Sequence, residues 1–241
     1  MLNKEKHQLI MGQILKDIYS DNSIASLLGF KGGTCAYFFY GLNRFSVDLD
    51  FDLFLTDEQT KLLVFEKIEG ILAKYGEVKS KQIKRFTIFL LLSYGKEDHN
   101  IKIEISTRNI IPNIKDYYDL KEYLSISMMV ANPIYLFSGK LAAIPLRQET
   151  AMRDIYDFYY FAKNNWDIDK KIVELFSEKT FLEHINDCIK TVEMINENQI
   201  LHGLGELINE KEKNWVKQNL KKESLFFLKN YESVHRRSIN G

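Results

Sequence analysis

The stretch from Lys31 to Asp52 constrains the fold more than any other part of the sequence. It reads KGGTCAYFFYGLNRFSVDLDFD. Its paired glycines predict a tight turn, its apolar residues 35–40 have roughly helical length, and residues 47–55 alternate like a strand. Asp48 and Asp50 are two apart in this strand, so both side chains project from one face. Because neighbouring carboxylates repel each other, we expect a cation between them, and Mg²⁺ held by oxygen ligands is the natural candidate.

The glycines and the aspartates together indicate phosphoryl or nucleotidyl transfer. Backbone N–H groups in a turn without side chains can approach a phosphate, and the N-terminus of a following helix adds a positive dipole end. The alternative is that Asp48 and Asp50 simply face solvent on an edge strand. The upstream Gly-Gly pair, with Arg44 and Ser46 in between, favours a functional site.

The same stretch resembles the AbiEii/AbiGii toxin family of nucleotidyltransferases, in the DNA polymerase β-like superfamily. Gly-Gly-Thr at 32–34 and Tyr-Gly-Leu-Asn-Arg-Phe-Ser-Val-Asp-Leu-Asp-Phe-Asp at 40–52 carry the resemblance. It implies an α+β fold, in which a polymerase β-like nucleotidyltransferase domain with a small mixed or antiparallel sheet precedes a helical C-terminal domain. We place these domains at residues 1–120 and 121–241.

A third carboxylate is expected from a neighbouring strand. Residues 83–94 contain a continuous apolar run that predicts a strand buried on both faces, and Gly95–Asn100 predicts a hairpin turn. Residues 101–105 alternate strictly, so Lys102 and Glu104 share a face. The resemblance implies that Glu104 is the third metal carboxylate. The alternative is a surface Lys/Glu pair on a half-exposed strand.

The pattern turns helical after Pro112, although residues 116–123 are ambiguous. Further helices are predicted at 134–147, from about 150 to 163, at 168–176, 180–196 and 205–236, with Asn219 as a candidate break in the last. Lys140 and Arg147 are seven residues apart, which would place them on one helix face. Asp154 and Asp157 are three apart and would share a face of the next helix.

These charged residues resemble the distal motifs of the same family. The resemblance implies that Lys140 neutralises charge on a nucleoside triphosphate, and that Asp154 orients Lys140 or Arg153 or acts as a base. The alternative is a set of salt bridges that packs two helices together.

Composition narrows the expected cellular location of the protein but does not indicate a binding partner. Lysine plus arginine equals aspartate plus glutamate, 33 each, although residues 211–237 are locally basic. Cys35 and Cys188 have no metal-type spacing, no apolar run approaches the roughly 20 residues that span a bilayer, and the N-terminus lacks a signal-peptide pattern. We therefore expect a cytoplasmic protein with no membrane partner.

The resemblance implies a magnesium-dependent nucleotidyltransferase toxin of a toxin–antitoxin or abortive-infection system. It would move a nucleoside monophosphate from an NTP to a hydroxyl of RNA, with tRNA as a candidate, or of protein, and a cognate antitoxin is a possible partner. The expected metal ligands, for Mg²⁺ or Mn²⁺, are Asp48, Asp50 and Glu104, and Lys140 and Asp154 complete the catalytic set. The expected nucleotide-binding residues are Gly32, Gly33, Thr34, Arg44, Ser46 and Lys140. For Arg44 the alternative is that its side chain braces the loop.

Two other functions remain open from the sequence. One is a non-catalytic nucleotide-binding or RNA-binding module with the same fold. The other is a small-molecule nucleotidyltransferase of the antibiotic-modifying kind, which needs an acidic pocket for a cationic acceptor. The basic stretch at 211–237 favours a nucleic acid over a cationic acceptor. The alternative is that it forms a solvated, lysine-rich helix face.

Overall fold

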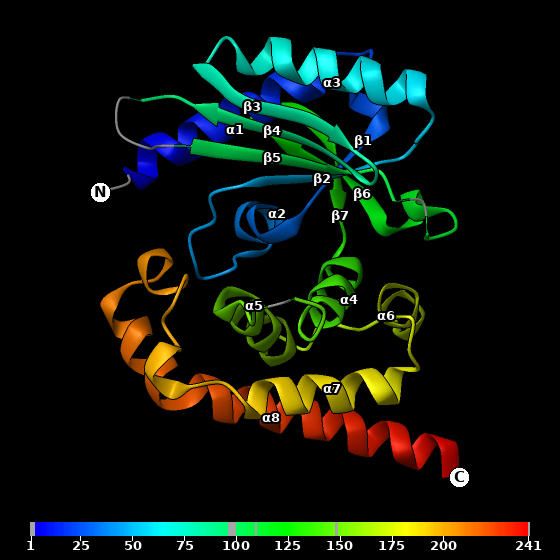
Figure 1. Ribbon diagram of the computed structural model, residues 1–241, viewed down its shortest axis with the longest axis vertical. Helices are drawn as coiled ribbons and strands as arrows, with labels where there is room; N and C mark the ends of the chain where they lie inside the picture. Colours follow the sequence, from blue (N-terminus) through cyan, green and yellow to red (C-terminus); the bar gives the residue numbers. More distant parts are fainter. Residues whose placement is uncertain (1–2, 96–99, 109, 148, 241) are drawn as a thin grey trace. The chain divides into compact units, whose positions relative to one another are not determined.

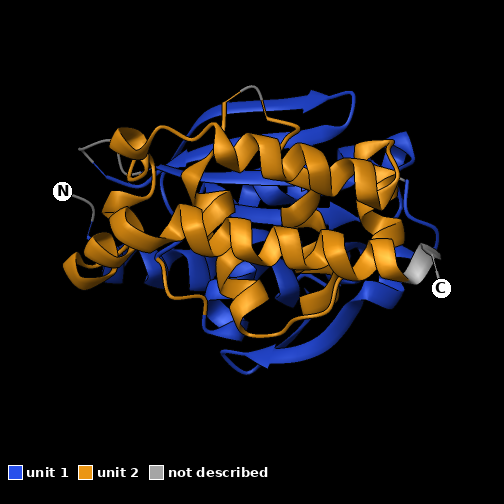
Figure 2. Cartoon of the chain, turned by 90° about the horizontal axis from the view of Figure 1, so that it is seen from below, with its two compact units in different colours: residues 1–41, 45–132 blue, residues 42–44, 133–241 orange. Residues whose placement is uncertain are grey.

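The computed structural model describes residues 3–95, 100–108, 110–147 and 149–240. The chain forms two compact units, coloured separately in Figure 2: unit 1 contains residues 1–41 and 45–132, and unit 2 contains residues 42–44 and 133–241. The sequence placed the boundary after residue 120, whereas residues 121–132 belong to unit 1 in the structure.

Unit 1 is built on a mixed sheet of seven described strands in the order β3-β4-β5-β2-β1-β7-β6. The strands are β1 (Leu28–Lys31), β2 (Leu49–Leu53), β3 (Glu77–Lys84), β4 (Thr87–Ser93), β5 (Asn100–Ser106), β6 (Tyr118–Tyr123) and β7 (Ile126–Ala131). Strand β2 runs parallel to β5 and β1 runs parallel to β7, while the other neighbours are antiparallel. The mixed sheet confirms the predicted fold of the N-terminal part.

Three α-helices cover this sheet. They are α1 (Lys4–Ser20), α2 (Gly32–Tyr40) and α3 (Glu58–Leu72). Short 3₁₀ turns precede two of the strands: η1 (Ala25–Leu27) leads into β1, and η2 (Ile114–Tyr117) leads into β6. Helices α1 and α3 lie on one face of the sheet and α2 on the other (Figure 1). Leu49, Phe51 and Ile103 are fully buried, so the apolar alternation in β2 and β5 builds the core and leaves the intervening polar residues on the α2 side.

The β6–β7 hairpin corrects the prediction that the chain turns helical after Pro112. Its turn residues, Leu124 and Ser125, have φ values of 51° and 61°. Two-residue hairpin turns with positive φ are usually marked by Asn or Gly. Because this turn carries neither, no local turn signal indicated the hairpin.

Strand β4 is less buried than its apolar run suggests. Ile88, Leu90 and Leu92 are fully buried, but Phe89 and Leu91 on the opposite face are half-buried. The prediction of a strand buried on both faces is therefore wrong for one face. Most of the turn predicted at Gly95–Asn100 lies outside the described residues.

Unit 2 is helical, as predicted. Its helices are α4 (Pro133–Ala143), α5 (Met152–Lys163), α6 (Lys170–Ser177), α7 (Phe181–Glu193) and α8 (Glu210–Asn240), with 3₁₀ turns η3 (Glu197–Gln199) and η4 (Gly205–Leu207). Helix α4 ends earlier than predicted because Pro145 disfavours helical backbone at Ile144. Helix α8 passes through Asn219, where a break was expected.

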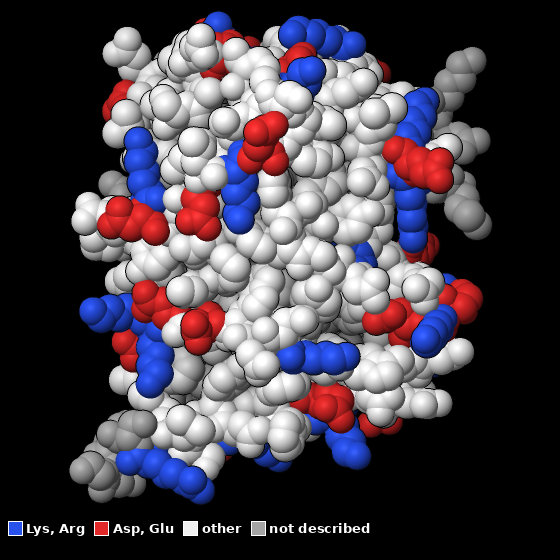
Figure 3. All heavy atoms as spheres, turned by 180° about the vertical axis from the view of Figure 1, so that it is seen from behind, with Lys and Arg blue, Asp and Glu red and all other residues white. Residues whose placement is uncertain are grey.

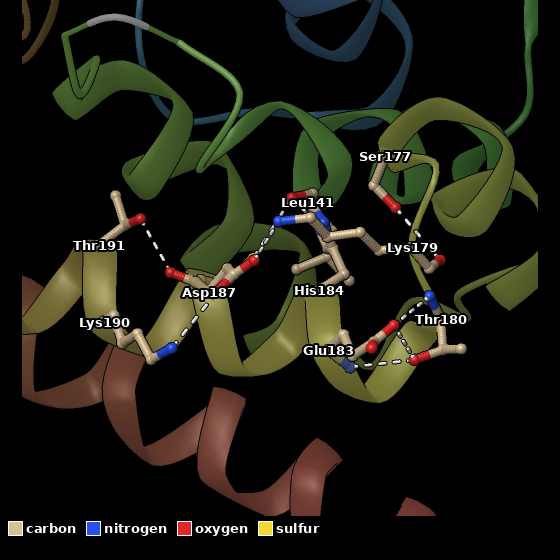
Figure 4. Close-up of polar contacts among 10 residues, drawn as sticks. Leu141, Ser177, Lys179, Thr180, Glu183, His184, Asp187, Lys190 and Thr191 are labelled. Atoms are coloured by element: carbon tan, nitrogen blue, oxygen red, sulfur yellow. Dashed lines mark hydrogen bonds and ion pairs between the residues drawn. The ribbon is translucent and has the colours of Figure 1, made fainter.

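A buried histidine fixes the C-terminal end of α4. His184 of α7 donates a hydrogen bond from Nε2 to the Leu141 carbonyl oxygen at 3.0 Å, as Figure 4 shows. Burial lowers the pKa of His184, so its imidazole is neutral near pH 7. This contact anchors the helical turn that carries Lys140. None of the helices in the described ranges is at once long and apolar enough to cross a bilayer.

Candidate functional site

The sheet of unit 1 gathers the three carboxylates predicted from the sequence. Asp50 in β2 lies directly opposite Glu104 in β5, and paired positions in neighbouring strands present their side chains on one face. Asp48 immediately precedes β2. Its Oδ2 is 3.4 Å from the Lys102 Nζ, which is 3.0 Å from Glu104 Oε2. The Lys102 ammonium thus lies between Asp48 and Glu104, and Asp50 is close enough to interact with it electrostatically.

The electrostatics of this group reflect its excess negative charge. Burial raises the pKa of Asp50, and the nearby Asp48 carboxylate raises it further, while Lys102 partly opposes both effects. Burial alone would lower the pKa of Lys102, but Asp48 and Glu104 raise it above its ordinary value. The carboxylates therefore favour the presence of positive charge among them.

The donor set suits a hard divalent cation, since Mg²⁺ prefers carboxylate oxygens. In the described ranges, however, no three His, Cys, Asp or Glu side chains stand together in an arrangement that could hold a metal ion. The Lys102 ammonium contacts two of the three expected ligands. The residues fit a metal by their chemistry, and binding one would require the lysine to move.

Gly32 leaves room for the Asp50 carboxylate. Its φ is 80°, and a Cβ atom at this position would lie 2.3 Å from Asp50 Oδ2. Helix α2 begins at Gly32, immediately after Lys31, which pairs with Asp50 across β1 and β2. The positive end of the α2 dipole therefore begins beside the carboxylates, where free backbone N–H groups suit a phosphate.

Thr34 and Ser46 support the backbone that carries Asp48. The Thr34 hydroxyl is hydrogen-bonded to the Ser46 hydroxyl at 2.9 Å and to the Asp48 carbonyl oxygen. Both hydroxyl side chains are buried. These contacts brace the site, and direct binding of nucleotide by Gly33, Thr34 and Ser46 stays a prediction.

The third aspartate of the motif, Asp52, has a different environment. Its carboxylate forms a salt bridge with Lys31 at 2.6 Å and accepts a hydrogen bond from the Tyr118 hydroxyl at 2.6 Å. Because this carboxylate is almost fully buried and well paired, Asp52 ties β1 and the start of β6 to β2.

Unit 2 contains a second, buried charged cluster. Arg44 donates from Nε and Nη2 to the two carboxylate oxygens of Asp157, at 2.5 and 2.6 Å. Lys140 Nζ lies 2.7 Å from Asp154 Oδ1 and 2.9 Å from Asp157 Oδ2. Arg147 pairs with the other oxygen of Asp154. Lys140 and Asp154, predicted from separate helices, are therefore in contact.

Two details of this cluster differ from the sequence predictions. Arg147 follows the end of α4 and does not share a helix face with Lys140, yet both reach Asp154. Arg44, expected to bind nucleotide, has its guanidinium held by Asp157, a residue that was not among the predicted site residues. The three-residue spacing of Asp154 and Asp157 was the available signal for it.

The cluster keeps its members charged. Burial alone would raise the pKa of Asp154, but Lys140 and Arg147 outweigh burial and bring it down to about 2. Burial alone would lower the pKa of Lys140, and Asp157 and Asp154 raise it above its ordinary value. Both members of the Lys140–Asp154 pair are therefore ionised near pH 7.

Comparisons with known proteins agree with this architecture. The family described as nucleotidyl transferase AbiEii toxin, type IV TA system, matches residues 13–230. MenT4, the nucleotidyltransferase toxin Rv2826c from Mycobacterium tuberculosis H37Rv, is similar with a TM-score of 0.62 and 20% identity, over 97% of this chain and 86% of that chain. JHP933 from Helicobacter pylori has a TM-score of 0.58 and 18% identity, over 100% of this chain and 97% of its own.

No curated protein matches this sequence. The two solved structures support the fold, whereas the family match extends over both units and includes every residue of the two charged clusters. The chain therefore belongs to the AbiEii family of nucleotidyltransferase toxins of type IV toxin–antitoxin systems.

Proposed function

We propose that this nucleotidyltransferase is magnesium-dependent and transfers a nucleoside monophosphate from an NTP to a hydroxyl group of RNA, releasing pyrophosphate. The observation that carries the proposal is the grouping of Asp48, Asp50 and Glu104 beside the N-terminus of α2. Bound Mg²⁺, or Mn²⁺, would neutralise triphosphate charge and lower the pKa of the attacking hydroxyl.

The residues of unit 1 have distinct roles in this proposal. Asp48 and Asp50 would hold the metal together with Glu104, and Glu104 would help to accept the proton of the acceptor hydroxyl. The N–H groups at Gly32 and Gly33 would bind phosphate oxygens, because they open a helix and carry no side chain that would block the approach. Thr34 and Ser46 would act through the Asp48 backbone that they support.

Lys140 and Asp154 of unit 2 are proposed for the same reaction, as the distal motif implies. The Lys140 side chain is 18% exposed, and its ammonium lies within ion-pair distance of Asp154 and Asp157. Asp154 and Asp157 keep that ammonium charged and oriented. Arg44 is proposed to position Asp157, since its guanidinium binds both oxygens of that carboxylate.

RNA is the proposed acceptor because of a basic hollow in unit 2. On the face drawn in Figure 3, basic and acidic side chains are interspersed, so net charge does not select a polyanion there. The hollow, of about 450 Å³, instead concentrates Lys217, Lys221, Lys222 and Lys229. Phe226, on the same hollow, is 58% exposed and offers an aromatic face to a base.

Incubation of the full chain with each labelled NTP, Mg²⁺ and total RNA tests the proposal. We expect label in RNA with at least one NTP, no label when EDTA is added, and about a thousandfold less with Asp48→Asn, which removes one metal ligand without changing side-chain size. Label found in protein instead of RNA would show that the acceptor is a protein. Equal labelling by wild type and Asp48→Asn would exclude the proposed site.

The same assay separates the other two functions left open by the sequence. NTP binding in calorimetry without transfer to any acceptor would indicate a non-catalytic module. Transfer to an aminoglycoside with none to RNA would indicate a small-molecule enzyme. Induced expression should arrest growth of wild-type cells and spare cells that express Asp48→Asn if a vital macromolecule is the acceptor.

A further inference from the structure

Lys102 is a charged residue of the carboxylate group to which the proposed reaction gives no role. It projects from β5 on the same face as Glu104, two residues away. Its Nζ lies 3.0 Å from Glu104 Oε2 and 3.4 Å from Asp48 Oδ2. The ammonium therefore bridges Glu104 within β5 and Asp48, the residue immediately before β2.

The charges around Lys102 do not balance. One ammonium faces three carboxylates, Asp48, Asp50 and Glu104, which leaves two net negative charges when all are ionised. A divalent cation would balance this excess, but it would need carboxylate oxygens that Lys102 contacts. The ammonium and the metal are both positive, so they would repel each other at this distance.

We propose that Lys102 is a displaceable counter-cation, which holds Asp48 and Glu104 together and must swing away when a divalent cation binds. This inference rests on the proposed function, because it takes the same three carboxylates as metal ligands. The Lys102 side chain is 28% exposed, which gives its ammonium a route to solvent. A lysine has a long flexible stem, so the movement needs no change in the backbone of β5.

Two consequences distinguish this role from a simple structural salt bridge. Removing the ammonium should strengthen binding of the metal, because a competitor is lost. The same change should lower the stability of the metal-free protein, because Asp48 and Glu104 then lose the ammonium that lies between them. A lysine that merely braced the ligands would make metal binding weaker when removed.

Titration of the full chain with Mn²⁺, followed by electron paramagnetic resonance without nucleotide, tests the proposal. We expect Lys102→Met to bind Mn²⁺ about tenfold more tightly than wild type. Lys102→Arg, which keeps the charge, should stay near wild type. Lys81→Met is the matched control, since it removes an exposed strand lysine that pairs with Glu69 outside the carboxylate group. Unchanged or weaker Mn²⁺ binding by Lys102→Met would overturn the inference.

Thermal unfolding provides the second measurement. Without metal, Lys102→Met should unfold at a lower temperature than wild type. Saturating Mn²⁺ should raise its unfolding temperature back to that of wild type. Asp48→Asn separates the two proposals: if it binds Mn²⁺ as well as wild type does, the proposed metal site fails. If Asp48→Asn loses binding but Lys102→Met gains none, only the role of Lys102 fails.

Discussion

The charged groups of the two units differ in how fully their charges are paired. In unit 1, one ammonium serves three carboxylates, and the side chains of Lys102 and Glu104 are 28% and 39% exposed. In unit 2, three cations, Arg44, Lys140 and Arg147, serve two almost fully buried carboxylates. The first group is short of positive charge and the second has a surplus. This difference is the basis for proposing that the first group binds a metal ion, while the paired charges of the second stabilise the fold of unit 2.

The largest expected effect is on catalysis in unit 1. Asp50→Asn should lower nucleotide transfer about a thousandfold, because it removes a metal ligand. Its thermal unfolding temperature should equal or exceed that of wild type, since burial and Asp48 already disfavour the charged form of Asp50. Activity and unfolding measured on one preparation would check both results. Clear destabilisation would show that this carboxylate supports the fold after all.

The next largest effect is on stability in unit 2. Arg44→Met should destabilise the protein by about 3 kcal/mol, because it strips the bidentate partner from buried Asp157. Chemical denaturation would measure this, with Arg44→Lys as a milder variant that keeps the charge. A double-mutant cycle with Asp157→Leu should recover part of the loss. If Arg44→Met were as stable as wild type, the pair would not hold the fold.

A smaller effect is expected on the stability of the protein at acidic pH. The pKa of Asp154 is about 2 in the folded protein against 3.8 as its ordinary value. Its contribution of about 2 kcal/mol is therefore complete above pH 3.8 and is lost as pH falls toward 2. Asp154→Asn should flatten the pH dependence of unfolding in this range. Asp50→Asn should not flatten it, since the raised pKa of Asp50 makes a contribution of opposite sign.

The smallest effect concerns the proposed RNA contact. The double variant Lys217→Glu, Lys222→Glu should weaken RNA binding about tenfold and reduce its salt dependence, because two potential phosphate contacts are reversed in charge. Filter binding over a range of salt concentrations would measure both. Lys163→Glu with Lys171→Glu changes net charge equally at exposed positions outside the hollow. Equal losses in the two double variants would attribute binding to net charge alone.

Local patterns made part of the site predictable. Strand alternation predicted that Asp48 and Asp50 share a face, and that Lys102 and Glu104 share a face. No local pattern says which strands are neighbours, so the expectation that these two strands pair came from the family resemblance. The structure confirms the mixed sheet and the helical C-terminal part. The sequence treated Lys102 only as half of a surface pair, because its second contact, Asp48, lies about fifty residues earlier, just before β2.

Long-range contacts were beyond the sequence patterns. Arg44 meets Asp157 across 113 residues, and no periodicity links the two positions. The β6–β7 hairpin was missed for a different reason, since Leu124 and Ser125 adopt backbone angles that the usual turn residues would have marked. The predicted C-terminal end of α4 could have been placed correctly from Pro145, because a proline disfavours helical backbone at the residue before it.

The tight fit of Gly32 against Asp50 gives experimenters a way to handle a protein whose family consists of toxins. A methyl group at position 32 would overlap a carboxylate oxygen, with a separation of 2.3 Å, so Gly32→Ala should silence the enzyme while leaving every ionisable side chain in the sequence. Cells should tolerate high expression of such a variant. Because its surface is otherwise unchanged, the variant would serve as bait to test whether an antitoxin binds this protein directly.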